Sequence, residues 1–202
     1  MFVSHKPEAK TVERFLKRQQ NQLFSYAEVG STRGPAPLGY NVDHHRIRLG
    51  KGLETFDRAI EAIKTWRMFG MDWTEIFPGN APIEDGSTVA ILIRHLGFWS
   101  LNASRIVYVI DDHDEVQRFG FAYGTLPDHA EQGEERFSVE YHAADGSVWY
   151  DLFAFSRPRH ILARLGYPFS RGLQRRFARD SLRAMEQAVN YEGSDSESRR
   201  SR

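Results

Sequence analysis

The second half of the chain is dominated by an alternation of apolar side chains with polar or small ones. This period of two is typical of half-buried β-strands, and it recurs in five segments: 87–97, 100–111, 116–126, 135–143 and 147–156. The connections between these segments are short or rich in turn-forming residues, and Asp145-Gly146 is the clearest turn signal among them. The pattern therefore predicts five successive strands that pair as antiparallel hairpins.

The first half of the chain mixes helical and strand periods. Apolar residues spaced three and four apart predict a helix at about residues 8–24 and another around Phe56–Trp66. Alternation predicts strands at 40–50 and around Trp73–Phe77, with connections rich in Gly and Pro. After the last strand, residues 159–190 form a predicted helical segment, which a Gly-Tyr-Pro triplet should interrupt.

Together these elements predict an α+β fold, in which helices collect on one face of a seven-stranded antiparallel sheet. Such a sheet twists, and with one apolar face it must curl, here around the long C-terminal helix. The space between sheet and helix is then either a filled core or a pocket. Residues 1–190 are expected to form one domain, and the polar tail 191–202 is expected to be disordered.

Composition narrows the possible functions. The 202 residues include no cysteine, their formal net charge is zero, and no apolar run is long enough to cross a bilayer. The first residues lack the apolar segment of a signal peptide. We therefore expect a cytoplasmic protein that neither inserts into membranes nor binds nucleic acid. No dinucleotide, phosphate-loop or zinc motif occurs, so no cofactor is expected, and the oligomeric state stays open.

Three blocks of sequence resemble a known family: LGYNVDHHRIRLGKGLETFDRAIEAIKTWRMF (38–69), GFAYGTLPDHAEQGEERF (120–137) and AFSRPRHILARLGYP (154–168). The family is a domain of unknown function numbered nineteen-ninety, and the resemblance covers residues 24–188. That family is grouped with the START-like, pollen-allergen-like helix-grip superfamily. The resemblance implies a sheet that grips a C-terminal helix over a hydrophobic cavity, and it implies no particular activity.

One strand carries large aromatics on one face and small residues on the other. Phe119, Phe121 and Tyr123 alternate with glycine and alanine at the positions between them. If the aromatics face inward they line the space beneath the helix. The small residues then either ease the coiling of the sheet or allow another segment to approach closely.

The residues expected to contact a ligand are polar or aromatic positions on otherwise apolar strand faces. They are Arg94 (or its neighbour His95), Tyr108, Phe119, Phe121, Tyr123, Tyr141 and Phe153.

The acidic stretch 126–137 contains the predicted connection 127–134 between two strands. His129, Glu131 and Glu135 are its candidate acid/base residues, with carboxyl pKa values tuned by partial burial. Alternatively, its carboxylates are solvated and pair with an arginine ladder spaced four apart on the C-terminal helix: Arg171, Arg175, Arg179 and Arg183. The same ladder could instead bind an acidic ligand or an anionic membrane surface.

Two histidine- or aspartate-rich stretches invite a metal interpretation. His44 and His45 are neighbours in a predicted strand and point to opposite faces, and 111–115 lacks the spacing of a calcium loop. No metal site is therefore expected.

Three functions follow from these patterns. The leading hypothesis is binding of a small hydrophobic or amphipathic molecule between the sheet and the C-terminal helix. The second is an enzyme that uses the same cavity for acid/base catalysis on an organic substrate. The third is a protein-interaction module with a filled core, whose arginine ladder meets an acidic partner.

Overall fold

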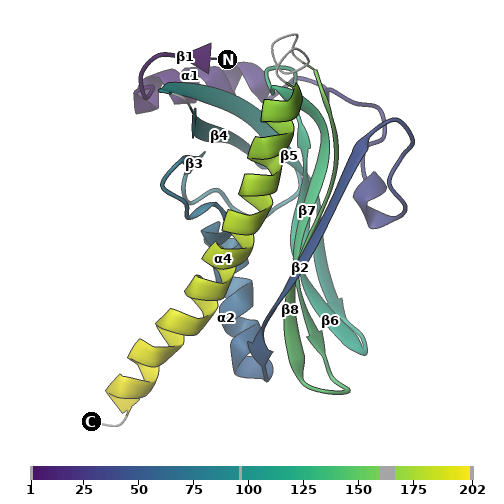
Figure 1. The fold of residues 1–202 in the computed structure, drawn as a ribbon, viewed down its shortest axis with the longest axis vertical. Helices are drawn as coiled ribbons and strands as arrows, with labels where there is room; N and C mark the ends of the chain where they lie inside the picture. The colour runs from purple at the N-terminus through teal and green to yellow at the C-terminus, as the bar shows by residue number, and fades with distance from the viewer. Residues whose placement is uncertain (1, 96, 160–166, 201–202) are drawn as a thin grey trace.

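The computed structural model describes residues 2–95, 97–159 and 167–200 (Figure 1). Its helices are α1 (Ala9–Gln19), α2 (Leu53–Lys64) and α4 (Tyr167–Arg200), with short 3-10 turns η1 (Ser31–Arg33) and η2 (Arg67–Phe69). Its strands are β1 (Phe2–Val3), β2 (Asn41–Lys51), β3 (Thr74–Phe77), β4 (Thr88–His95), β5 (Phe98–His113), β6 (Val116–Thr125), β7 (Glu131–His142) and β8 (Ser147–Pro158).

The strands form one curved antiparallel sheet in the order β2-β8-β7-β6-β5-β4-β3. The seven predicted strands and their hairpin connections are confirmed, and the two-residue β1 adds an eighth strand that pairs with β5. Helix α4 runs obliquely across the concave side of the sheet (Figure 1). The predicted helix-grip fold is thereby confirmed.

The main core lies between the concave face and helices α2 and α4. The inward aromatics Phe121 and Phe137 are fully buried there, together with Ile63 of α2 and Met185 of α4. Because side chains alternate between faces along a strand, one face of each strand is committed to this core. The helical stripe that predicted α2 is the face that packs against it.

Helix α1 lies on the opposite face of the sheet from α2 and α4. Its Val12, Phe15 and Leu16 pack against Leu92 and Leu101 in a second core cluster. The expectation that all helices gather on one face was therefore wrong, because β4 is apolar on both faces and β5 adds Leu101 and Ala103 to the outer one.

Helix α1 also ends earlier than predicted. It stops at Gln19, and Leu23, which the predicted helix included, is 85% exposed.

The small residues of β6 allow other segments to approach closely, which is one of the two predicted purposes. A Cβ at Gly120 would lie 2.2 Å from the backbone oxygen of Phe137, so a larger residue there would clash with the adjacent strand. A Cβ at Gly124 would lie 2.2 Å from Tyr26 Oη, because residues 24–26 pack on that outer face. Large side chains therefore point inward, and the small ones admit the chain's own N-terminal segment.

The acidic stretch is a strand rather than a loop over most of its length. β7 begins at Glu131, four residues before the predicted start, and pairs with β8 from that residue onward. Glutamates at 131, 134 and 135 are therefore held in register by the sheet.

Helix α4 continues as far as Arg200, beyond the predicted start of the tail at 191. Extending an existing helix needs no new nucleus, which is the costly step of helix formation. The disorder expected for the tail stays a prediction. The interruption predicted around 166–168 falls partly outside the described residues.

Candidate functional site

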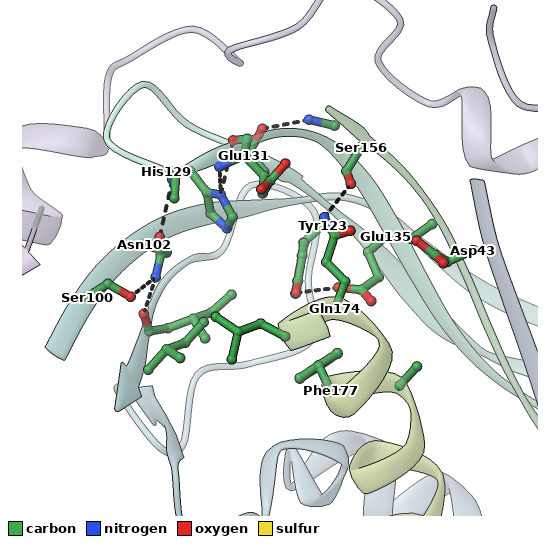
Figure 2. Close-up of a pocket in the computed structure, with 18 of the residues that line it drawn as sticks. Asp43, Ser100, Asn102, Tyr123, His129, Glu131, Glu135, Ser156, Gln174 and Phe177 are labelled. Carbon is green, nitrogen blue, oxygen red and sulfur yellow. Dashed lines mark hydrogen bonds between the residues drawn. The ribbon is translucent and has the colours of Figure 1, made fainter. Parts of the chain in front are cut away.

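A cavity of about 540 Å³ lies between the concave face of the sheet and α4 (Figure 2). Most of its wall is apolar: Phe69, Trp73, Ile91, Ile93, Phe98, Leu152, Phe155, Leu173, Phe177 and Ala178. A smaller polar group includes Asp43, Ser100, Asn102, Tyr123, His129, Glu131, Glu135, Ser156 and Gln174. The third hypothesis required a filled core, and the interior contains a cavity instead.

His129 and Glu131 lie together at the β6–β7 connection. Imidazole Nδ1 of His129 is 3.0 Å from both the backbone N and the backbone O of Glu131, so either tautomer satisfies it. Burial lowers the pKa of His129 to about 4, so its imidazole is neutral at physiological pH. These backbone contacts occupy Nδ1 and fix the ring in the cavity wall.

The Glu131 carboxyl is the least satisfied polar group of the cavity wall. Its Oε2 is buried and has no hydrogen-bond partner among the described residues. Burial raises the pKa of Glu131 to about 7, and the positive charge of Arg171 opposes this shift. A carboxyl with a pKa of about 7 is partly ionised at neutral pH. A change in its surroundings therefore shifts the balance between its charged and neutral forms.

Glu135 and Tyr123 form a second polar pair, contributed by neighbouring strands. The Tyr123 hydroxyl donates a 2.7 Å hydrogen bond to Glu135 Oε2 (Figure 2). Burial raises the pKa of Glu135 to about 7, and the negative charge of the nearby Asp43 adds to this shift. The hydrogen bond from Tyr123 opposes it, because it favours the charged form. Burial and the Glu135 charge raise the pKa of Tyr123, so the phenol stays protonated.

Arg171 joins the start of α4 to the edge strand β2. Its two terminal nitrogens lie 2.6 and 2.9 Å from the two carboxylate oxygens of Asp43, a bidentate ion pair that is mostly buried. One turn along α4, Gln174 donates a 3.0 Å hydrogen bond to Ser156 of β8. These contacts fix the helix over the cavity.

Asn102 anchors the opposite wall. Its amide nitrogen donates to Ser100 Oγ and to the backbone oxygen of Ile91, and its oxygen accepts from the backbone N of Ala130 (Figure 2). Asn102 thereby connects β4 and β5 to the segment that carries His129. Sequence reasoning missed Asn102, Asp43 and Gln174, because isolated polar residues in a strand or helix give no periodic signal.

All three candidate acid/base residues, His129, Glu131 and Glu135, line the cavity. Of the seven residues expected to contact a ligand, Tyr123 lines it. Phe119, Phe121 and Tyr141 face the same side of the sheet but pack in the filled core beside α2. His95, the alternative to Arg94, lines the cavity, whereas Arg94 is exposed on the other face.

Tyr108 and Phe153 lie on the outer face of the sheet. The register of β5 shifts between Ile106 and Tyr108, so Tyr108 leaves the core face and meets Thr32. Phe153 follows the core residue Leu152 and packs against His44 and Arg136.

The arginine ladder does not pair with the acidic stretch as predicted. Arg171 binds Asp43 of β2, and among the described residues Arg175, Arg179 and Arg183 make no ion pair. Glu134 instead accepts hydrogen bonds from Tyr26 Oη, Gly30 N and the backbone and hydroxyl of Thr32. The segment before β2 therefore satisfies the carboxylate that the ladder was expected to meet.

Within the described parts of the chain, no group of acidic, histidine or cysteine side chains is arranged to hold a metal ion. None of the helices described is both long and apolar enough to cross a membrane.

The fold and the cavity define a helix-grip protein with an internal, mostly apolar site. The chain belongs to the family described as Domain of unknown function (DUF1990), which matches residues 25–184. It is 37% identical to a UPF0548 protein of Dictyostelium discoideum, with 94% of this chain and 96% of the relative covered. It is 38% identical to a UPF0548 protein of Deinococcus radiodurans, with 94% and 99% covered.

Solved structures show more distant likenesses. Hypothetical protein jhp0584 from Helicobacter pylori matches with a TM-score of 0.49 at 9% identity, over 75% of this chain and 88% of that one. Human STARD10 matches with a TM-score of 0.46 at 9% identity, over 94% and 84%. These likenesses are too distant to support an argument about function.

Proposed function

We propose that this protein binds a small, largely apolar organic molecule in the cavity between the sheet and α4. The observation that supports this most directly is the cavity of about 540 Å³ with a mostly apolar wall. Small-molecule sites are typically clefts of roughly 300–1,000 Å³ with a few convergent polar groups that fix the ligand's orientation. The polar groups here come from strands β2 and β4 to β8, from the β6–β7 connection and from helix α4, and the hydrogen bonds described above fix several of them.

Native mass spectrometry of freshly purified protein tests this proposal, with the same sample denatured as the reference. The expected result is a discrete excess mass that disappears on denaturation and identifies the ligand's class. A bare mass, together with no thermal shift across lipids, isoprenoids and aromatic compounds, would overturn the proposal.

Acid/base catalysis in the same cavity is the second candidate function. It is favoured by one observation, that His129, Glu131 and Glu135 all line the cavity and that both carboxyls have pKa values raised to about 7. Groups with pKa values near the working pH are efficient general acids and bases. An enzyme would return the bound compound chemically altered after incubation, whereas a carrier would return it unchanged.

A further inference from the structure

Among the described residues of the cavity wall, the side chains that carry a full charge are all carboxyls. Asp43, Glu131, Glu134 and Glu135 contribute carboxyls, whereas no lysine or arginine is among the described residues that line the cavity. The nearby cation Arg171 already binds both oxygens of Asp43. Glu134 is satisfied by four hydrogen bonds from the outer segment. The unmatched acidic groups are therefore Glu131 and Glu135.

These two carboxyls retain hydrogen-bonding capacity that the described residues do not use. Glu131 Oε2 is buried without a partner, and Glu135 accepts one hydrogen bond, from Tyr123. An ionised carboxylate in an apolar site is costly unless it is paired. Figure 2 shows both side chains at the same cavity, with Tyr123 and Phe177 nearby.

We propose that the ligand of this cavity carries a protonated amine, which binds at Glu131, on an apolar body that packs against the aromatic wall. This inference rests on the proposed function. Glu131 and Glu135 lie four residues apart on β7, about 13 Å along the strand, so a single ammonium group contacts one of them, and Glu131 is the one with a buried oxygen that has no partner among the described residues. An ammonium group supplies both the positive charge and the hydrogen-bond donors that this carboxylate lacks. Phe69, Trp73 and Phe177 offer aromatic surface to the rest of such a molecule, whereas an anionic head group would face the carboxyls of the wall.

Three probes with a common body test the charge preference directly. They are 2-(1-naphthyl)ethylamine, 2-(1-naphthyl)ethanol and 1-naphthylacetate, which differ in head-group charge. Their dissociation constants for the full chain are measured by calorimetry at about pH 8, where the amine and both carboxyls are charged. The amine is expected to bind about tenfold or more tightly than the alcohol, and the acid more weakly than both.

Charge-removing variants locate the preference within the protein. Glu131→Gln should weaken amine binding by about tenfold while the affinity for the alcohol changes by less than about twofold, and Glu135→Gln, four residues further along β7, should weaken amine binding less. Glu61→Gln removes the same charge from the exposed face of α2, outside the cavity wall, and should leave all three affinities unchanged. Should a cavity variant fail to fold, the order of the three probes on the native chain still decides the question.

The outcomes separate this inference from the function on which it rests. If the alcohol or the acid binds as tightly as the amine, the amine proposal is wrong while the apolar cavity remains a binding site. An amine preference that survives in Glu131→Gln would also overturn it. If no probe binds and native mass spectrometry finds no ligand, the proposed function itself fails.

Discussion

At the residue scale, the two cavity carboxyls make stability depend on pH in a defined direction. Both have pKa values of about 7 in the fold against an ordinary value of 4.5. Between these values the folded protein binds more protons than the unfolded chain, so its stability falls as the pH rises through this window. Glu131→Gln or Glu135→Gln should remove that loss. Each variant should gain about 1–3 kcal/mol relative to the native chain between pH 5 and pH 8, in urea unfolding.

The buried histidine acts in the opposite direction over an overlapping window. Its pKa is lowered to about 4 from 6.5, so the unfolded chain binds more protons in this range and stability falls as the pH drops. Arg171, Asp43 and Tyr123 also face the two carboxyls, and the variants must therefore be compared as differences from the native profile. Parallel pH profiles of the native chain and both glutamine variants would contradict the carboxyl assignment, and Glu61→Gln should match the native profile.

At the element scale, the Asp43–Arg171 pair should stabilise the attachment of α4 to the edge of the sheet. A double-mutant cycle with Asp43→Asn and Arg171→Gln isolates the coupling between the two side chains. Because the pair is bidentate and mostly buried, we expect a coupling of about 1–2 kcal/mol in the free energy of unfolding.

The matched control is Arg176–Asp180, a more exposed pair four residues apart on the same helix. Its coupling should be about 0.3–0.5 kcal/mol, as for other surface pairs at this helical spacing. Equal coupling in the two pairs would show that the Asp43–Arg171 contact does not anchor the helix.

The elements themselves were largely predictable, since alternation and helical stripes depend on local sequence. Which face a residue takes was less predictable. The register shift after Ile106 turns Tyr108 outward. Around Phe153, β8 carries apolar residues on both faces, so the alternation does not show which face is inward. The strand start at Glu131 was hidden because acidic residues and Gly133 resemble a loop. An amphipathic helix such as α1 shows that one side is buried, but not which face of the sheet buries it.

At the scale of the whole molecule, the inner surface is divided into a filled half and an open half. Beside α2, Phe119, Phe121 and Tyr141 close the core, whereas towards the start of α4 the wall leaves the cavity. The filled half supplies most of the closely packed core, and the other half leaves the cavity open. Of the six aromatic residues predicted to contact a ligand, Phe119, Phe121 and Tyr141 lie in the filled half, because aromatic residues serve packing and binding alike.

This division predicts that the cavity can be filled without loss of the fold. Ala154 lies on β8 between Asp43 of β2 and Glu135 of β7, and its side chain lines the cavity. Ala154→Phe should place a ring in the open space and abolish probe binding. Its free energy of unfolding should stay equal or rise by about 1 kcal/mol, because apolar surface is buried without displacing the core.

The same substitution at the exposed turn residue Ala143 is the control and should leave probe binding unchanged. Unchanged affinity in a folded Ala154→Phe protein would place the binding site elsewhere; if phenylalanine prevents folding, Ala154→Leu offers the same test with a smaller side chain.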